Sequence, residues 1–390
     1  MSLNRGIDPH PVRMSAPTSP LQGEEIASRK LAVTRVQLTN FRSYANAEIA
    51  VSGRPVVLAG PNGAGKTNIL DAISLLAPGR GLRGAKLSEH IRRGPQLRIP
   101  ANVARSNSVA GAVRREDAQQ NPESMPSEAL WAVAATVFRG AEAYDIGTGL
   151  TLGANGGERR AVRLNGVAAQ SSADLGEIVQ MTWLTPAMDR LFSEGASGRR
   201  RFLDRLVLGF DPGHGRRAQR YETAMRERSR LLKFGPRDPM WLDGLEKEMA
   251  EAGVAIAASR IAAVTRLNAM LSERGEASAF PCAQLALEGE TDVLLQEFGA
   301  DTEAKIRALL LRSRVPDAES GHTAFGPHRS DLAVRHTQKR ADARECSTGE
   351  QKALILNLVL AQAARLSRAE SAPNPILLLD EVAAHLDPDR

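Results

Sequence analysis

A glycine-rich segment that ends in Lys-Thr is the most chemically informative feature of the chain. It reads Gly-Pro-Asn-Gly-Ala-Gly-Lys-Thr and fits the pattern G-x-x-x-x-G-K-[ST], in which backbone amides cradle phosphate oxygens. In this pattern Lys66 would neutralise the β- and γ-phosphates of ATP, and the Thr67 hydroxyl would ligate Mg²⁺. The alternative is a glycine-rich turn that matches by chance. The predicted nucleotide-binding residues are Gly60, Pro61, Asn62, Gly63, Ala64, Gly65, Lys66 and Thr67.

A second segment supplies the acidic groups that ATP hydrolysis needs. The apolar run 376–379 ends in Asp380 and Glu381, as expected of a buried parallel strand. From there Asp380 would hold Mg²⁺ together with Thr67, and Glu381 would act as the general base or orient the attacking water. Lys66 and Glu381 are therefore the predicted catalytic residues. The two segments together predict a site that hydrolyses ATP or switches on it.

The residues around the glycine-rich segment predict the elements that position it. Pro55 to Ala59 reads as a short buried strand, and Asn68 to Leu76 reads as a helix with apolar residues at helical spacing. The order of strand, loop and helix brings the positive end of the helix dipole to the phosphates. The context therefore favours a true phosphate-binding loop.

A third segment offers a second helix N-terminus for phosphate. Ser347, Thr348 and Gly349 precede good helix formers from Glu350 to Arg368, so that Ser347 or Thr348 can serve as the N-cap. One triphosphate reaches two helix N-termini only if two surfaces close over it, which is how ABC-type ATPases work. In that class Ser347 and Gly349 would contact the ATP of the other subunit, and we expect an ATP-dependent homodimer. The alternative is an ordinary capped helix.

The number of residues between the first and third segments narrows the class of ATPase. Thr67 and Ser347 are 280 residues apart, more than the insert of a transporter ATPase would fill. From about Leu31 to Arg390 the chain resembles the bacterial RecF family, whose heads are related to those of SMC and Rad50 and carry a short arm. The residues that carry the resemblance are Leu38 to Tyr44, Arg200 to Asp204, Tyr221, Arg228 to Leu232, Phe325 to Leu332 and the helix after Ser347.

The resemblance implies a fold and a function. The fold would be α/β, an ABC-type P-loop ATPase head with a mixed sheet and flanking helices, interrupted by an α-helical arm. The function would be slow ATP hydrolysis that resets a protein bound to linear or gapped duplex DNA, without sequence choice, in replication and recombinational repair. The partners would be the RecR and RecO mediators and, indirectly, RecA, in the cytoplasm. Asp387 would belong to the D-loop that couples the two ATP sites.

The sequence also leaves alternative functions and alternative residue roles open. The main alternative function is a nucleotide-dependent protein-interaction switch that does not touch DNA. An SMC-like clamp would need sustained heptads, and the insert is too short and irregular for them. In related heads Asn40 and Arg42 would touch the nucleotide. For His328 and Arg329 we weigh a functional role against a buried, hydrogen-bonded pair near the junction of head and arm.

Positive charge is concentrated in one segment. Residues 199–237 hold twelve Arg or Lys and four Asp or Glu, a local charge of +8 in a chain with a formal net charge of +6. Such a segment predicts contacts with the phosphate backbone, and Arg199, Arg200 and Arg201 are the candidate DNA-binding residues. The alternative is an arm face whose charges pair with neighbours. Aromatic residues make up 4% of the chain, which argues against base stacking as the main contact.

The composition indicates a cytoplasmic protein without a membrane partner. The chain has two cysteines, Cys282 and Cys346, without metal-ligand spacing, and no secretory segment, so that we expect a reducing compartment. No apolar run predicts a membrane span.

Four segments are predicted along the chain. Residues 1–30 would form a disordered extension, 31–185 the first part of the head and 186–313 the helical arm. Residues 314–390 would form the second part of the head, with the signature segment (Ser347, Thr348 and Gly349 at the start of its helix), the acidic strand and the D-loop. Residues 98–127 read as a surface loop. The chain stops at Arg390, where the family continues with another strand, a switch histidine and closing helices. We therefore expect a truncated product that binds nucleotide but hydrolyses it poorly.

The arm is expected to contain a helical hairpin. Asp238 caps a long helix that begins at Pro239, and Tyr221 to Lys233 would be its partner. After the arm, His322 to His336 would return to the sheet as a strand. The predicted apolar stripe of the long helix comprises Trp241, Leu245, Met249, Ile256, Ala263 and Leu267.

Overall fold

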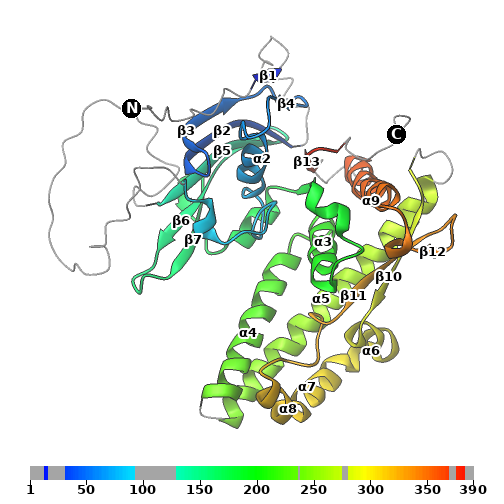
Figure 1. Ribbon diagram of the computed structural model, residues 1–390. Helices are drawn as coiled ribbons and strands as arrows, with labels where there is room; N and C mark the ends of the chain where they lie inside the picture. The colour runs from blue at the N-terminus through cyan, green and yellow to red at the C-terminus, as the bar shows by residue number, and fades with distance from the viewer. Residues whose placement is uncertain are drawn as a thin grey trace, which may run out of the picture. The chain divides into compact units, whose positions relative to one another are not determined.

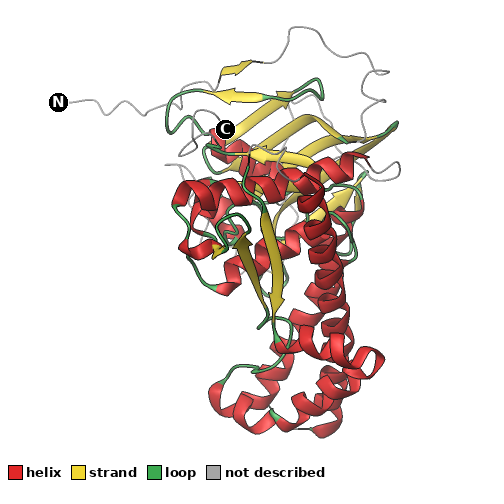
Figure 2. Ribbon diagram, turned by 90° about the vertical axis from the view of Figure 1, so that its right-hand side faces the viewer, coloured by secondary structure: helices red, strands yellow, loops and turns green. Residues whose placement is uncertain are grey.

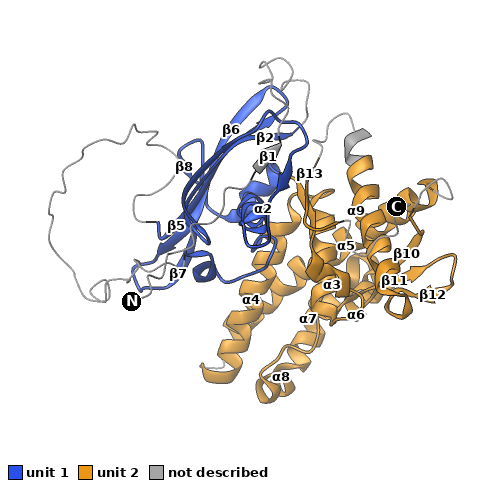
Figure 3. Cartoon of the chain, turned by 45° about the horizontal axis from the view of Figure 1, so that its top comes forward, with its two compact units in different colours: residues 1–179 blue, residues 180–390 orange. Residues whose placement is uncertain are grey.

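The computed structural model describes residues 13–15, 31–92, 129–235, 238–274, 280–368 and 375–382. The chain divides into two compact units, Met1–Val179 and Gln180–Arg390 (Figure 3). The predicted surface loop 98–127 and most of the predicted extension 1–30 lie outside the described residues.

Unit 1 is built on a six-stranded antiparallel sheet with the strand order β3-β2-β5-β6-β7-β8 (Figure 1). Burial alternates along β5, so that Trp131, Val133 and Val137 all point into the core, as a sheet with one packed face requires. The strands are β2 (Ala32–Phe41), β3 (Tyr44–Ala50), β5 (Trp131–Arg139), β6 (Glu142–Leu152), β7 (Glu158–Leu164) and β8 (Val167–Ala168).

The strand before the phosphate loop differs from the prediction. It is β4 (Val57–Ala59), which pairs antiparallel with β1 (Arg13–Ser15) outside the six-stranded sheet. Because this two-stranded ribbon leaves both faces of the strand uncovered, Val57 is 65% exposed, and the expectation of a buried strand was wrong. The pairing also corrects the prediction of a disordered extension for residues 13–15.

Unit 2 contains the predicted parallel strand, but of its four residues only Leu378 is buried and Leu379 is 42% exposed, so the expected burial is only partly right. β13 (Ile376–Leu379) pairs parallel with β9 (Met181–Leu184), with Ile376 opposite Met181 and Leu379 opposite Leu184. Beside them lies α9 (Thr348–Arg368), whose residues from Gln351 to Val359 are all buried. The signature helix therefore belongs to the core of this unit, next to the strand that ends in the acidic pair.

The helical hairpin of the arm is confirmed. α4 (His214–Phe234) packs along α5 (Pro239–Arg274) (Figure 1), and Asp238 accepts a hydrogen bond from the Met240 amide at the start of α5, 2.9 Å away. Trp241 is 48% exposed and lies outside the core, contrary to the predicted stripe. Leu242 takes its place, because it packs against the last turn of α4. Four shorter helices complete the unit: α3 (Ala196–Leu208), α6 (Glu290–Phe298), α7 (Thr302–Arg312) and α8 (Arg314–Ser320).

A separate three-stranded sheet joins one strand from within the segment predicted as the helical arm, 186–313, to two strands that follow it. β10 (Ala283–Glu288) and β11 (Asp331–His336) run antiparallel side by side (Figure 2), and β12 (Ala341–Asp342) adds an edge. The strand predicted for His322 to His336 therefore begins only at Asp331, and its sheet is distinct from that of unit 1. Gly326, with φ 138°, lies in the irregular stretch before it.

Among the described residues, α5 is the one helix long and apolar enough to cross a membrane by length and composition, with a mean hydropathy of 1.3 in its most apolar window. The sequence prediction had found no such segment. Its buried residues, Met249, Ile256 and Leu267 among them, pack against other elements of unit 2, which is the arrangement of a core helix.

Candidate ATP site

The glycine-rich segment forms a loop that leads directly into α2 (Lys66–Ser74). Gly65 is its N-cap with φ 95° and ψ 5°, and its carbonyl accepts hydrogen bonds from the amides of Asn68 and Ile69. Gly63 also has a positive φ of 82°. Such conformations cost glycine little and other residues much, so the glycines keep the loop closely applied to the helix N-terminus. This geometry suits a phosphate group.

The turn between β2 and β3 packs against the phosphate loop. A β-carbon at Gly65 would lie 2.5 Å from the Tyr44 hydroxyl oxygen. The side-chain amide of Asn68 donates to the Ser43 hydroxyl at 2.9 Å. The Lys66 amine donates to the carbonyl oxygens of Gly60 and Pro61, at 2.8 and 2.9 Å. Because this amine lies over its own loop, a bound triphosphate would meet it there.

Arg42 and Asn40 stand at the same turn with strained backbones, at φ 49° and 50°. The Arg42 guanidinium donates to the buried carboxylate of Asp71 on α2 at 2.6 Å. Burial alone would raise the pKa of Asp71, but His90 and Arg42 outweigh it and lower that pKa. Arg42 thus ties the turn between β2 and β3 to α2. Its contact with nucleotide stays a prediction.

The acidic pair directly follows β13 in unit 2. The Asp380 amide donates to the Leu184 carbonyl at 2.9 Å, which extends the parallel ladder by one residue. Glu381 then turns sharply, with φ 50°, and its side chain is exposed. Among the described residues no group of three or more His, Cys, Asp or Glu gathers. A Mg²⁺ held by one carboxylate, a hydroxyl and phosphate oxygens needs no such cluster, so Asp380 and Thr67 remain chemically suited to it.

The signature segment caps α9 as predicted. The Ser347 amide donates to the Glu350 carboxylate at 3.0 Å, and the Glu350 amide donates back to the Ser347 hydroxyl at 3.4 Å. This reciprocal arrangement is a capping box. A hydrogen bond from Lys339 and the one from the Ser347 amide lower the pKa of Glu350 to about 2. Gly349 lies in the first turn of α9, so the segment presents a capped helix N-terminus.

The predicted site residues are divided between the two units. The phosphate loop, Gly60 to Thr67, lies in unit 1, whereas Ser347, Gly349, Asp380 and Glu381 lie in unit 2. Within unit 2 the structure brings the signature helix and the acidic strand together, because the Lys352 amine on α9 donates to the Glu381 carbonyl at 3.1 Å.

Comparison with known proteins assigns the family. Residues 32–390 match the model of the RecF/RecN/SMC N-terminal domain. The DNA replication and repair protein RecF of Caulobacter vibrioides is 47% identical over 91% of this chain and 86% of its own length. The RecF protein of Rhizobium etli is 44% identical over 93% and 87%.

The chain belongs to the RecF family. A solved structure of the recombination mediator protein RecF with ATP, in the RecFOR pathway, matches with a TM-score of 0.68 and 22% identity, covering 93% of this chain and 87% of that one. This likeness concerns the fold, and it confirms the predicted class of an ABC-type ATPase head with a helical insertion.

In the basic segment of this RecF-family chain, two of the three predicted DNA-binding arginines make hydrogen bonds within the protein. Arg199 is 9% exposed and forms a bidentate ion pair with Asp331, so it cannot also meet a phosphate. Arg200 is half-buried and donates to the Ser330 carbonyl at 2.8 Å. Arg201 is exposed, and its DNA contact stays a prediction.

Several other arginines of the segment are also engaged within the protein. Arg205 lies over the Trp183 ring, with its guanidinium carbon 3.9 Å from the ring centroid, and burial lowers the pKa of Arg205 to about 9. Arg220 pairs with Glu248 and Glu251. The alternative of an arm with paired charges therefore accounts for much of the local charge of +8.

The Gly-Pro-His-Arg segment, which sequence reasoning left open, is tied into the arm. The Tyr221 hydroxyl lies 2.7 Å from Nδ1 of His328, and Nε2 of His328 lies 3.0 Å from the Thr323 carbonyl. Burial lowers the pKa of His328. A β-carbon at Gly326 would lie 2.0 Å from the Tyr221 hydroxyl. These contacts favour the structural alternative for His328, while Arg329 is exposed and donates to the Thr323 carbonyl.

One predicted residue lies outside the described part of the chain, and one residue of the site was not predicted. Asp387, the predicted D-loop residue, lies outside the described residues. Lys352 is a residue that sequence reasoning missed, although a lysine beside Ala353 and Leu354 in an apolar helix was a visible signal.

Proposed function

We propose that this RecF-family chain is an ATP-dependent DNA-binding protein of replication and recombinational repair that dimerises when it binds ATP. One observation carries the proposal: the chain holds both a phosphate loop at the start of α2 and a capped signature helix N-terminus at α9. Two such termini serve one nucleotide when two copies close over it.

Dimerisation follows from linkage. ATP that contacts the loop of one copy and Ser347 and Gly349 of the other binds the closed dimer better than the open monomer. It therefore shifts the population towards the dimer. The reciprocal capping of Ser347 and Glu350 supports this role, because it holds the first turn of α9 in a fixed geometry.

Hydrolysis is proposed to be slow and to reset the dimer. Lys66 would stabilise charge on the β- and γ-phosphates, and Glu381 would take a proton from the attacking water or orient it. Thr67 and Asp380 would hold Mg²⁺, which supplies charge neutralisation when bound. Because each site is complete only in the dimer, turnover depends on association.

The DNA substrate is proposed to be linear or gapped duplex, bound without sequence choice in the cytoplasm. The names of the relatives, DNA replication and repair protein RecF, support this. The description of the solved RecF structure, which names the RecFOR pathway, supports RecR and RecO as partners. RecA would be the indirect partner. Arg201 remains the candidate phosphate contact of the basic segment.

The second candidate function is a nucleotide-dependent protein-interaction switch. It is favoured by the internal pairing of Arg199, Arg220 and Arg228, which reduces the charge available to DNA. Exposed apolar side chains at the ends of α4 and α5 point the same way, since Phe234 is 80% exposed and Met240 is 83% exposed.

The deciding experiment is binding of a gapped duplex with ATP, ADP or no nucleotide at two salt concentrations, together with the oligomeric state. ATP-dependent, salt-weakened binding that accompanies dimerisation and is lost in Lys66→Ala is the expected result. Dimerisation by ATP without any DNA binding would instead favour the interaction switch. No response to nucleotide in either assay would contradict both functions.

A further inference from the structure

A lysine is buried where the signature helix meets the acidic strand. Lys352 is 1% exposed and among the largest fully buried side chains of the described residues. Lysine is almost never buried to this extent unless it is paired. It lies one helical turn beyond Thr348, the first residue of α9, and therefore on the same face of the helix.

The Lys352 side chain connects two other elements. Its amine donates to the main-chain carbonyl of Glu381 at 3.1 Å and lies 3.7 Å from the carboxylate of Asp189. Asp189 belongs to the short 3-10 helix Pro186–Arg190 that follows β9. The other carboxylate oxygen of Asp189 is buried and has no hydrogen-bond partner within the described part of the chain. The amine thus connects the signature helix to the 3-10 helix after β9 and to the backbone of Glu381.

The carbonyl that Lys352 holds belongs to a strained residue. Glu381 has φ 50°, in the left-handed region, which costs an ordinary L-residue of the order of 1 kcal/mol or more. Such a conformation persists where the surroundings determine it. On one side the Asp380 amide is fixed to Leu184 of β9. On the other side the peptide that follows Glu381 is fixed by Lys352.

We propose that Lys352 is a positioning residue for ATP hydrolysis, which ties the N-terminal turn of the signature helix to the backbone of Glu381 and so sets the direction of its carboxylate. This inference rests on the proposed hydrolysis by Glu381. When phosphate engages Ser347 and Gly349, a movement of the first turn of α9 carries the Lys352 amine with it. The position of the Glu381 backbone then depends on whether phosphate is bound to Ser347 and Gly349.

The test uses the full chain with Lys352→Met, which keeps the length and apolar stem of the side chain and removes its amine. Gln362→Met is the matched control, because Gln362 is also buried on α9, but its side-chain amide donates to the Leu206 carbonyl of α3 and not to Glu381. ATP affinity, the kcat and KM of phosphate release, and the melting temperature are measured for each. Lys352→Leu, which also removes the amine, replaces Lys352→Met if the latter does not fold.

The expected result is a fall in kcat of roughly 10- to 100-fold in Lys352→Met, as small displacements of catalytic groups produce, with ATP affinity changed by less than about threefold. Gln362→Met should lower the melting temperature as much as Lys352→Met does, but keep the wild-type kcat. Equal kcat values in the two variants, or parallel loss of ATP binding and kcat, would overturn the role of Lys352. If the wild-type chain binds ATP but releases no phosphate, the proposed hydrolysis fails and the inference with it.

Discussion

Arg199 and Asp331 face each other in a bidentate ion pair, with Nε 2.8 Å from Oδ1 and Nη2 2.7 Å from Oδ2. The two residues are 132 positions apart, and the pair joins α3 to the start of β11. Arg199 also donates to the Phe192 carbonyl at 3.2 Å. Its guanidinium is therefore saturated by the protein, whereas Arg201, two positions further along the same helix, is exposed.

This contrast predicts opposite outcomes for two neighbouring substitutions. Arg199→Met should lower the free energy of unfolding by roughly 3 kcal/mol, because Asp331 loses its charged partner in a largely buried site. Arg201→Ala should leave stability within about 0.5 kcal/mol. It should also reduce the slope of log affinity for duplex DNA against log salt by about 1, if it meets one phosphate.

Denaturant unfolding and DNA binding at several salt concentrations check both variants. If folded Arg199→Met lost DNA affinity with a reduced salt slope while its stability stayed at the wild-type level, the structural assignment of Arg199 would be wrong. An unchanged salt slope in Arg201→Ala would remove Arg201 from the DNA surface.

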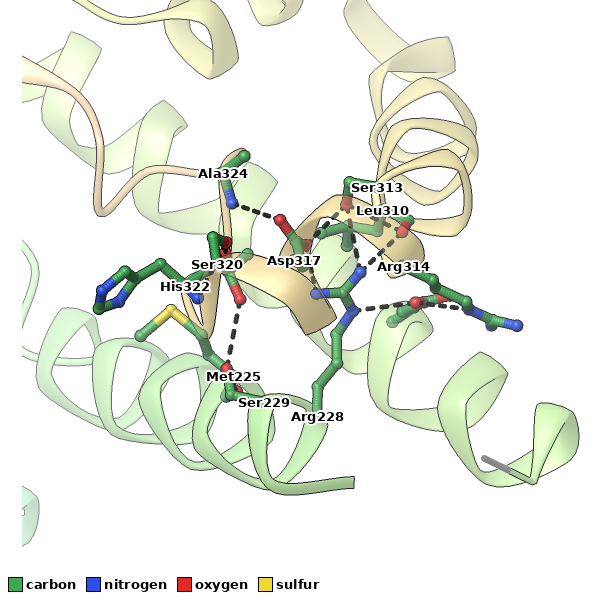
Figure 4. A network of polar contacts seen from close by, with 12 residues as sticks. Met225, Arg228, Ser229, Leu310, Ser313, Arg314, Asp317, Ser320, His322 and Ala324 are labelled. Atoms are coloured by element: carbon green, nitrogen blue, oxygen red, sulfur yellow. Dashed lines mark hydrogen bonds and ion pairs between the residues drawn. The ribbon is translucent and has the colours of Figure 1, made fainter. Parts of the chain in front are cut away.

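The arm has its own buried charge network around Arg228 (Figure 4). Its guanidinium is fully buried and bonds Glu246 at 2.9 Å, Asp317 at 2.6 Å and the Leu310 carbonyl at 2.7 Å. These partners come from α5, α8 and α7, so that one side chain of α4 holds three helices. Arg314 also bonds Glu246, which leaves Asp317 most dependent on Arg228.

Arg228→Met should therefore destabilise the chain by about 3–5 kcal/mol, because it leaves the Asp317 carboxylate buried without its charged partner. Arg230→Met on the same helix is the control, since Arg230 is 64% exposed and its pair with Glu227 contributes at most about 0.5 kcal/mol. Urea unfolding of both variants measures the difference. Equal midpoints would show that the buried network adds nothing to stability.

Local patterns in the sequence predicted the elements whose causes are local. The glycines of the phosphate loop, the cap at Asp238 and the cap at Ser347 all act within a few residues, and the structure has them where expected. The parallel strand before Asp380 was readable because four apolar residues stand together.

Long-range partners account for what the sequence could not predict. A run of arginines reads as a basic surface until Asp331 and Asp317 are placed opposite Arg199 and Arg228, and those carboxylates are 132 and 89 positions away. The exposure of Val57 depends on pairing with residues 13–15. The role of Lys352 depends on the meeting of α9 with the end of β13, which no local spacing encodes.

The pH dependence of stability has an identifiable contributor in Asp204. Burial would raise its pKa, but a hydrogen bond from His214 and the charge and hydrogen bonds of Arg260 outweigh it and lower the pKa to about 2 from the ordinary 3.8. Because the folded-state pKa is depressed, the stabilisation is complete above about pH 4 and is lost as pH falls through about 2. The difference corresponds to about 2 kcal/mol.

Asp204→Asn should remove this contribution. The difference in free energy of unfolding between wild type and variant should be largest at neutral pH and shrink as pH falls from about 4 to about 2. Denaturant titrations at a series of pH values measure it. A difference that stays constant over that window would mean that the Asp204 carboxyl titrates normally in the folded chain.

The phosphate loop allows two glycines with similar backbones to be compared. Gly63 and Gly65 have φ 82° and 95°, but a β-carbon at Gly63 would meet nothing within 4 Å, whereas one at Gly65 would lie 2.5 Å from the Tyr44 hydroxyl. Both Ala substitutions bear the cost of a positive φ, about 1 kcal/mol. Only Gly65→Ala must also displace Tyr44 or shift the start of α2.

Gly65→Ala should therefore lower ATP affinity at least tenfold more than Gly63→Ala, measured by calorimetric titration of ATP into each variant. Tyr44→Phe removes the atom nearest to the new methyl group, and in combination with Gly65→Ala it should restore part of the loss, while the aromatic carbon 3.0 Å away keeps the restoration incomplete. If Gly63→Ala were as damaging as Gly65→Ala, backbone strain alone would explain both, and the support of the loop by Tyr44 would be without consequence for ATP.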